Sequence, residues 1–261
     1  EHCSPQPETL RYLKHVPDPF DLRRDTRFRS RVIPAHFTEE TRDWLLALED
    51  GSRFRCRFLI TAIGVLSAPV MPRIEGVDRF KGRSFHTARW PHEPVSFEGQ
   101  RVAVVGTGAT GVQTIQEVAK TAGQLTVFQR TPNWCTPLHN RKIDSAEMAK
   151  IRAGYPEMFK RCQETFACFV HTPDPRGTFE VTPEEREAFF EHLYASPGFG
   201  IWQGNFKDIL TNREANAAIS DFVARKIRQR VKDPSVAEKL IPKDHGFGTR
   251  RVPMETHYFE V

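Results

Sequence analysis

Three glycines near the middle of the chain, Gly106, Gly108 and Gly111, have the spacing Gly-x-Gly-x-x-Gly. Between a strand and a helix, such glycines permit a tight turn, a close approach of the backbone to a pyrophosphate, and close helix–strand packing. The amides at the start of the helix then face the phosphates. The spacing predicts a dinucleotide site, although a glycine-rich turn without a ligand would look the same. The candidate cofactor-binding residues of the turn are Gly106, Thr107, Gly108, Ala109, Thr110, Gly111 and Gln113.

The residues after the next apolar run indicate which dinucleotide is bound. NAD sites usually carry Asp or Glu about 20 residues beyond the glycines, for the ribose 2′-hydroxyl. Here Arg130 stands 19 residues beyond Gly111 (130 − 111) and Thr131 follows it. A guanidinium attracts a 2′-phosphate, which a carboxylate would repel. We therefore expect NADP(H), with Arg130 and Thr131 as its ligands. The alternative is that Arg130 is a solvated surface residue.

The segments around the glycines have the pattern of a strand–helix–strand unit. Arg101–Val105 is a short apolar, β-branched run that suits a buried parallel strand. Val112–Thr121 is predicted to be a helix and Leu125–Phe128 a second strand. The glycines then follow the first strand directly, and Arg130 follows the second.

A second motif precedes this unit and reads F-x-G-x-x-x-H-x-x-x-W-P. Its residues are Phe80, Gly82, His86, Trp90 and Pro91. The motif resembles the fingerprint of Baeyer–Villiger monooxygenases, flavoproteins that use FAD and NADPH. Further segments resemble the same family, namely Thr61–Gly64, Leu66–Pro69, Gly106–Gln113, Val127–Pro132 and Gly246–Arg251. The resemblance covers essentially the whole chain.

The resemblance implies an α/β fold, with a Rossmann-like NADP-binding domain, a helical insertion and part of a FAD-binding domain. The implied boundaries are 1–68 for the C-terminal part of the first FAD-domain segment, 69–143 for the NADP-binding domain, 144–245 for the insertion and 246–261 for the return to the NADP domain. The family has flavin-domain sequence before and after these segments. We therefore expect an internal fragment of a longer enzyme, with a natural truncation as the alternative.

The activity that the resemblance implies is insertion of one oxygen atom from O2 next to a ketone carbonyl, which gives an ester or lactone. NADPH would reduce FAD, and a C4a-peroxyflavin would attack the ketone. Arg251 falls at the position of the family's catalytic arginine. Arg250 falls where the family usually has a lysine that helps to bind the 2′-phosphate, and Arg keeps the charge. Without the resemblance, both would read as a solvated basic pair near Lys243.

Other interpretations stay open at this point. A related flavin monooxygenase would oxidise amines or sulfides, but its fingerprint usually ends in an aromatic–lysine pair, unlike Trp90-Pro91. The chain as it stands could also be a flavin-less NADP-binding module, or a plain structural domain. His86 could position the cofactor, or it could be a hydrogen-bonded residue that holds a domain junction.

Composition excludes several classes of protein. Hydrophobic residues make up 39% and charged residues 27%, as in a folded globular protein. The net charge of +5 without interleaved basic and aromatic residues does not favour nucleic acid, and no apolar run is long enough for a membrane span. The five scattered cysteines predict no metal site and fit a reducing cytoplasm. The oligomeric state is left open.

The remaining segments predict a mixture of elements. Strands are expected at Thr26–Ala35, Thr41–Glu49 and Arg53–Ile63, with a hairpin turn at Glu49–Gly51. Helices are expected at Glu8–Phe20 up to the first proline, Ser145–Lys160 with Ser145 as N-cap, Thr182–Tyr194 with a capping box, and Asn212–Lys232. Aromatic side chains expected in the core are Phe159, Phe166, Phe169, Phe189 and Phe190.

Overall fold

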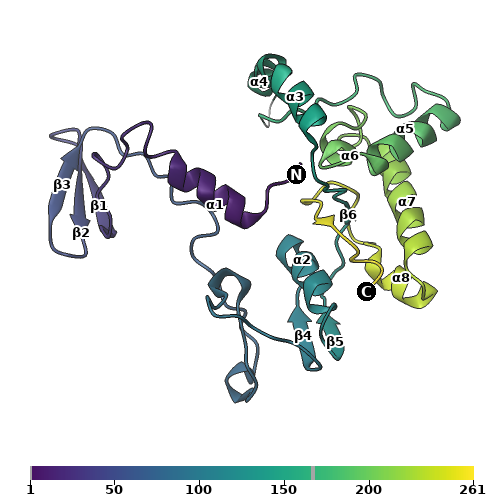
Figure 1. Cartoon of the computed structure of the whole chain (residues 1–261), viewed down its shortest axis with the longest axis horizontal. Helices are drawn as coiled ribbons and strands as arrows, with labels where there is room; N and C mark the ends of the chain where they lie inside the picture. The colour runs from purple at the N-terminus through teal and green to yellow at the C-terminus, as the bar shows by residue number, and fades with distance from the viewer. Residues whose placement is uncertain (1, 166–167) are drawn as a thin grey trace. The chain divides into compact units, whose positions relative to one another are not determined.

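The computed structural model describes residues 2–165 and 168–261 (Figure 1). The chain divides into two compact units, Ser4–Glu93 and Pro94–Val261, the latter joined by the first residues of the chain. The glycine turn, Arg130 and the Arg250–Arg251 pair belong to the unit that contains Pro94–Val261, whereas the fingerprint motif belongs to the unit Ser4–Glu93. No helix among the described residues is long and apolar enough to span a membrane.

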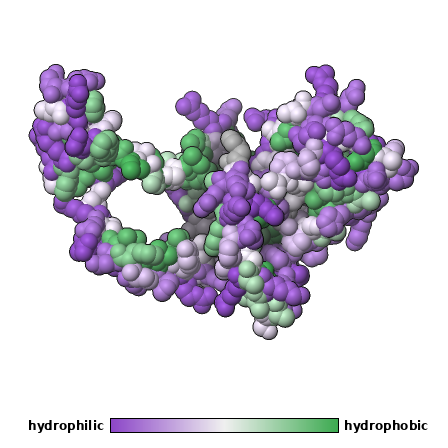
Figure 2. Space-filling view, turned by 90° about the horizontal axis from the view of Figure 1, so that it is seen from above, coloured by the Kyte–Doolittle hydropathy of each residue, from purple (hydrophilic) through white to green (hydrophobic). Residues whose placement is uncertain are grey.

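The unit Ser4–Glu93 is built around a three-stranded antiparallel sheet. β1 (Val32–Thr38), β2 (Asp43–Leu48) and β3 (Arg53–Cys56) are neighbours in chain order and form a β-meander, so the three strands predicted here are confirmed in their number and order. The predicted hairpin turn between β2 and β3 is also confirmed, with Gly51 in the left-handed region at φ +83°. Apolar side chains of the sheet are exposed, namely Ile33, Phe37 and Phe54. Figure 2 shows hydrophobic and hydrophilic residues side by side on the molecular surface.

Several elements of this unit are shorter than predicted. The α1 helix (Gln6–His15) ends before the first proline, as expected, but β1 begins at Val32 rather than Thr26. β3 ends at Cys56, and the strand predicted as far as Ile63 is wrong beyond that point. Ile60 is 88% exposed. Apolar, β-branched residues do not form a strand without a partner to pair with and a surface to pack on. Two short 3₁₀ helices follow, Val77–Arg79 and Thr87–Arg89.

The second unit begins with the predicted strand–helix–strand arrangement. β4 (Arg101–Val105) leads through the glycine turn into α2 (Ala109–Val118), and β5 (Gln124–Phe128) returns parallel to β4. The α2 helix starts earlier than predicted, because the amide of Val112 already donates a helical hydrogen bond of 2.9 Å to the carbonyl of Gly108. Val112, buried with the rest of the apolar face of α2, anchors the helix in the core.

From residue 145 onward this unit is mostly helical. Its helices are α3 (Ser145–Ala153), α4 (Tyr155–Glu164), α5 (Pro183–Ala195), α6 (Gly200–Gln203), α7 (Arg213–Arg230) and α8 (Pro234–Leu240). The single helix predicted for Ser145–Lys160 is wrong: the helix breaks at Gly154, and its N-cap is Asp144, whose carboxylate accepts an amide hydrogen bond of 2.8 Å. The predicted capping box at Thr182 is confirmed, and α7 follows the predicted Asn212–Lys232 closely.

The core of this unit lies between α5, α7 and the segment that follows α8. The largest fully buried aromatic side chains are Phe190, Phe206, Phe222 and Phe247. Of the aromatic residues predicted to be core, Phe189 and Phe190 pack there, whereas Phe159 is 58% and Phe169 42% exposed, and Phe166 lies outside the described residues. Near the C-terminus, β7 (Met254–Glu255) pairs in parallel with β6 (Thr136–Pro137).

An ion network around one fully buried carboxylate connects α7 to β7. The guanidinium of Arg230 donates to both carboxylate oxygens of Glu255, at 2.6 and 3.2 Å, and to Glu260 at 2.6 Å. The side chain of Glu255 is fully buried. Burial alone would lower the pKa of Arg230, but the hydrogen bonds to Glu260 and Glu255 outweigh it and raise the pKa. Arg230 therefore stays charged and holds the end of α7 to β7.

Candidate functional site

The glycine turn has the geometry that its sequence predicts. Gly106 directly follows β4 and has φ +102°, which L side chains rarely adopt. A Cβ atom at Gly111 would collide with the carbonyl oxygen of Gly106, whereas Gly108 has open space around it. The three glycines thus have different roles: turning the chain, leaving room for a ligand, and letting α2 approach the turn.

The amides at the start of α2 have no side-chain cap. Gly108 is the N-cap residue, and no side chain caps the helix there. The first helical residues therefore offer N–H groups and the positive end of the helix dipole. Thr107 is buried, and its hydroxyl donates a hydrogen bond of 3.2 Å to the carbonyl of Thr131. This bond joins the glycine turn to the residues that follow β5.

A cavity of about 390 Å³ lies at the carboxyl ends of β4 and β5. Six of the predicted cofactor residues line it: Gly106, Thr107, Gly108, Arg130, Thr131 and Arg250. Arg250 reaches the cavity from a segment far along the chain, so one cavity combines the glycine turn with two guanidinium groups. The predicted residues Ala109, Thr110, Gly111 and Gln113 lie in the first turns of α2 and are not part of the lining.

The two arginines of the cavity differ in their partners. Arg130 is exposed and forms no ion pair within the described part of the chain. Arg250 donates to the carboxylate of Asp244 at 3.2 Å, and the imidazole of His245 lies 2.7 Å from the same carboxylate. The hydrogen bond from His245 lowers the pKa of Asp244, and the charge of Arg250 acts in the same direction. Asp244 therefore stays ionised beside Arg250.

Sequence reasoning missed Asn133, which also lines the cavity. Its side-chain amide donates a hydrogen bond of 3.4 Å to the carbonyl of Arg251, and its Oδ1 atom is buried without a hydrogen-bond partner. The only local signal was a polar residue two positions after Thr131. The side chain of Arg251 is exposed and does not line this cavity.

The fingerprint residues belong to the other unit. His86 caps the short 3₁₀ helix Thr87–Arg89, and its Nδ1 atom accepts a hydrogen bond of 3.1 Å from the amide of Ala88. Trp90 packs on Phe85, with ring centroids 5.4 Å apart. A Cβ at Gly82 would meet the ring of Phe80, and Pro91 is half-buried. These contacts are local.

Comparison with known proteins places this arrangement in a family. The chain matches the family described as flavin-binding monooxygenase-like over residues 6–156. It is 52% identical to the 2-oxo-Δ3-4,5,5-trimethylcyclopentenylacetyl-CoA monooxygenase of Pseudomonas putida, over 100% of this chain and 49% of that protein. It is 39% identical to the acetone monooxygenase (methyl acetate-forming) of Gordonia sp. (strain TY-5), over 98% of this chain and 48% of that protein.

Solved structures agree with the sequence comparison. The crystal structure of OTEMO in complex with FAD and NADP superposes with a TM-score of 0.94 at 52% identity, over 98% of this chain and 49% of that chain. The chain thus has a mixed α/β fold and spans about half the length of the curated relatives that it matches. Together with the family match over residues 6–156, this shows that the chain belongs to the flavin-binding monooxygenase-like family and resembles its Baeyer–Villiger members.

Proposed function

We propose that this chain binds NADP(H) in the cavity at the carboxyl ends of β4 and β5. The observation that carries the proposal is that one cavity is lined by the glycine turn, Arg130, Thr131 and Arg250. The turn would hold the pyrophosphate, since Gly108 leaves its backbone accessible and the amides of α2 are uncapped. The buried, unpartnered Oδ1 of Asn133 supports a polar ligand at the same place.

The charges of the cavity favour the phosphorylated dinucleotide. Arg130 and Arg250 both line it, and the described lining contains no Asp or Glu that could bind a ribose 2′-hydroxyl. A 2′-phosphate between two guanidinium groups can accept several charge-assisted hydrogen bonds. Thr131 adds a hydroxyl donor. We therefore propose that Arg130, Thr131 and Arg250 bind the 2′-phosphate of NADP(H).

For the complete protein we propose an FAD- and NADPH-dependent Baeyer–Villiger monooxygenase that converts a ketone and O2 to an ester or lactone. Support comes from relatives whose names describe ketone oxygenation, such as cyclopentanone 1,2-monooxygenase, and from structures described with FAD and NADP. Bound FAD would supply the activation of O2. Arg251, exposed beside Arg250, would offer a fixed cation to the oxyanion that develops at the carbonyl.

The proposed function implies a division of the chain into cofactor-binding domains. Residues 69–143 would form the Rossmann-like NADP-binding domain, interrupted by a helical insertion at 144–245 and completed by 246–261. Residues 1–68 would belong to the FAD-binding domain. The fingerprint residues fall within the compact unit Ser4–Glu93, and His86 would act as a hydrogen-bonded linker residue or as a cofactor-positioning one. The five unpaired cysteines fit a cytoplasmic location.

Product analysis on the complete protein tests this proposal. A cyclic ketone, NADPH and O2 should give a lactone, whereas a thioether should be a poor substrate by comparison. Arg251→Ala should reduce lactone formation by about two to three powers of ten, the usual cost of losing a group that stabilises an oxyanion. The same variant should bind NADP⁺ as the unmodified protein does. Lactone formation that is unchanged in Arg251→Ala would refute the role of this residue.

A further inference from the structure

The segment that carries both arginines has no regular secondary structure until β7 and is held by side chains of other elements. We call residues 244–251 the arginine loop. The indole of Trp134 donates to the carbonyl of His245 at 3.0 Å, and the indole of Trp202 donates to the carbonyl of Gly248 at 3.1 Å. Phe247, between them, is fully buried. The loop is therefore anchored at several points along its backbone.

The tightest of these anchors is a pair of side chains one turn apart on α7. The Nδ2 atom of Asn216 donates to the carbonyl of Phe247 at 2.8 Å and to the carbonyl of Ile209 at 2.7 Å. The hydroxyl of Ser220 accepts the amide of Phe247 at 3.0 Å and donates to Asn216 Oδ1 at 3.3 Å. Both backbone polar groups of Phe247 are thus paired with α7, as they would be with a neighbouring strand.

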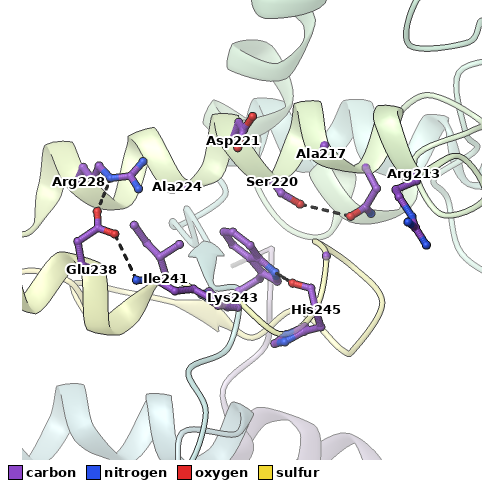
Figure 3. Close-up of a pocket in the computed structure, with 14 residues that line it drawn as sticks. Arg213, Ala217, Ser220, Asp221, Ala224, Arg228, Glu238, Ile241, Lys243 and His245 are labelled. Carbon is purple, nitrogen blue, oxygen red and sulfur yellow. Dashed lines mark hydrogen bonds and ion pairs between the residues drawn. The ribbon is translucent and has the colours of Figure 1, made fainter.

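The contact is also close in space. A Cβ atom at Gly246 would overlap the Oδ1 atom of Asn216, so this glycine lets the loop backbone lie directly on α7. Figure 3 shows Ser220 on α7 opposite the segment that carries Lys243 and His245, at a second cavity of about 420 Å³. Loss of the Asn216 side chain would therefore release the loop backbone, because this side chain both lies against Gly246 and donates to the carbonyl of Phe247.

From this geometry we propose that Asn216 is a positioning residue, which sets the arginine loop so that Arg250 lies in the nucleotide cavity and discriminates NADP from NAD. This inference rests on the proposed role of Arg250. Phe247 and Arg250 are joined by a short turn in which the hydroxyl of Thr249 donates to the carbonyl of Gly246 at 2.8 Å. Fixing Phe247 on α7 therefore restricts where Arg250 can reach.

A double-mutant cycle on the complete protein tests the proposal by titration with NADP⁺ and NAD⁺. Arg250→Ala should raise the Kd for NADP⁺ by roughly tenfold and leave that for NAD⁺ nearly unchanged. Asn216→Ala should raise the Kd for NADP⁺ by roughly fivefold and likewise leave the Kd for NAD⁺ nearly unchanged. Because Asn216 acts through Arg250, the double variant should match Arg250→Ala alone.

Asn212 provides a matched control on the same helix. Its side chain caps α7 by accepting the amides of Glu214 and Ala215 at 2.9 and 3.1 Å, and among the described residues it forms no hydrogen bond with the arginine loop. Asn212→Ala should lower the melting temperature without changing the ratio of the two Kd values. A general loss of stability would instead give the same ratio change in both α7 variants.

The outcomes separate the two levels of the argument. If Arg250→Ala leaves the Kd for NADP⁺ unchanged, the proposed role of Arg250 is wrong, and the role of Asn216 fails with it. If Arg250→Ala weakens NADP⁺ binding but Asn216→Ala does not, the inference about Asn216 alone is overturned. The inference about Asn216 would also be overturned if the two effects multiplied, so that the double variant raised the Kd for NADP⁺ roughly fiftyfold.

Discussion

The substitution Arg130→Ala should weaken NADP⁺ binding more than any other change in the cavity. Arg130 forms no ion pair within the described residues, so its guanidinium is available to a phosphate without breaking another contact. A hydrogen bond to a charged group contributes about 1.5–3 kcal/mol net. The expected increase in Kd is therefore about 10- to 150-fold, at about 1.4 kcal/mol for each factor of ten.

Arg250→Ala gives an internal comparison. Arg250 already donates to Asp244 at 3.2 Å, so a phosphate shares this guanidinium with a carboxylate. Its loss should fall at the lower end of the same range, at roughly tenfold. Because both arginines are exposed, raising the ionic strength should reduce the difference between each variant and the unmodified protein.

Calorimetric titration of the complete protein with NADP⁺ and with NAD⁺ measures these effects. NAD⁺ lacks the 2′-phosphate, so its Kd should change less than about twofold in either variant. Lactone formation at saturating NADPH should persist, since neither arginine is assigned to the oxygenation step. An equal loss of affinity for both dinucleotides in Arg130→Ala would refute the reasoning, because it would mean that Arg130 supports the turn and does not contact the phosphate.

Two further predictions concern the network between α7 and β7. Glu255→Ala would remove the fully buried carboxylate from the partly buried Arg230, which would keep its ion pair with Glu260, and should cost about 3–5 kcal/mol of unfolding free energy. Thermal denaturation would report this as a fall of roughly 6–20 °C in Tm; a fall under 2 °C would contradict it. Burial alone would raise the pKa of Glu260, but the hydrogen bond from Arg230 and the positive charges of Arg230 and His257 together outweigh it, so the pKa is lowered from its usual 4.5. The stability that Glu260 contributes is therefore present above pH 4.5 and lost as the pH falls through the lowered pKa. The unfolding free energies of Glu260→Gln and the unmodified protein should differ at pH 7 and converge in acid, as unfolding curves measured at several pH values would show. A constant difference at all pH values would contradict this.

Local sequence was sufficient to predict the conformation of the glycine turn, which lies at the centre of the proposed nucleotide site. The roles of Gly106, Gly108 and Gly111 follow from steric requirements within one turn, and the position of Arg130 follows from the length of one helix and one strand. The start of α2 was misplaced, because periodicity reports where side chains are buried and Val112 is the first residue of the helix to be fully buried. Its helical hydrogen bonds begin before that point.

Contacts between distant segments could not be predicted in the same way. Arg250 was assigned to the site only by resemblance, because no local pattern indicates that it meets Arg130. The pairing of Asn216 with Phe247 leaves no trace in periodicity, since an Asn in a helix usually signals a solvent-exposed position. The strand predicted up to Ile63 failed for a related reason: strand formation depends on a partner, and propensity does not supply one.

The β4–β5 sheet has a consequence for handling the protein. In the described part of the chain it has only two parallel strands, an arrangement that is usually found buried within larger sheets. Val105 and Phe128, which pair at its carboxyl end, are 66% and 56% exposed. Each strand also presents an outer edge on which another chain could add a strand. In isolation, this sheet is therefore a template for self-association, and aggregation would begin at the same strands that border the proposed nucleotide cavity.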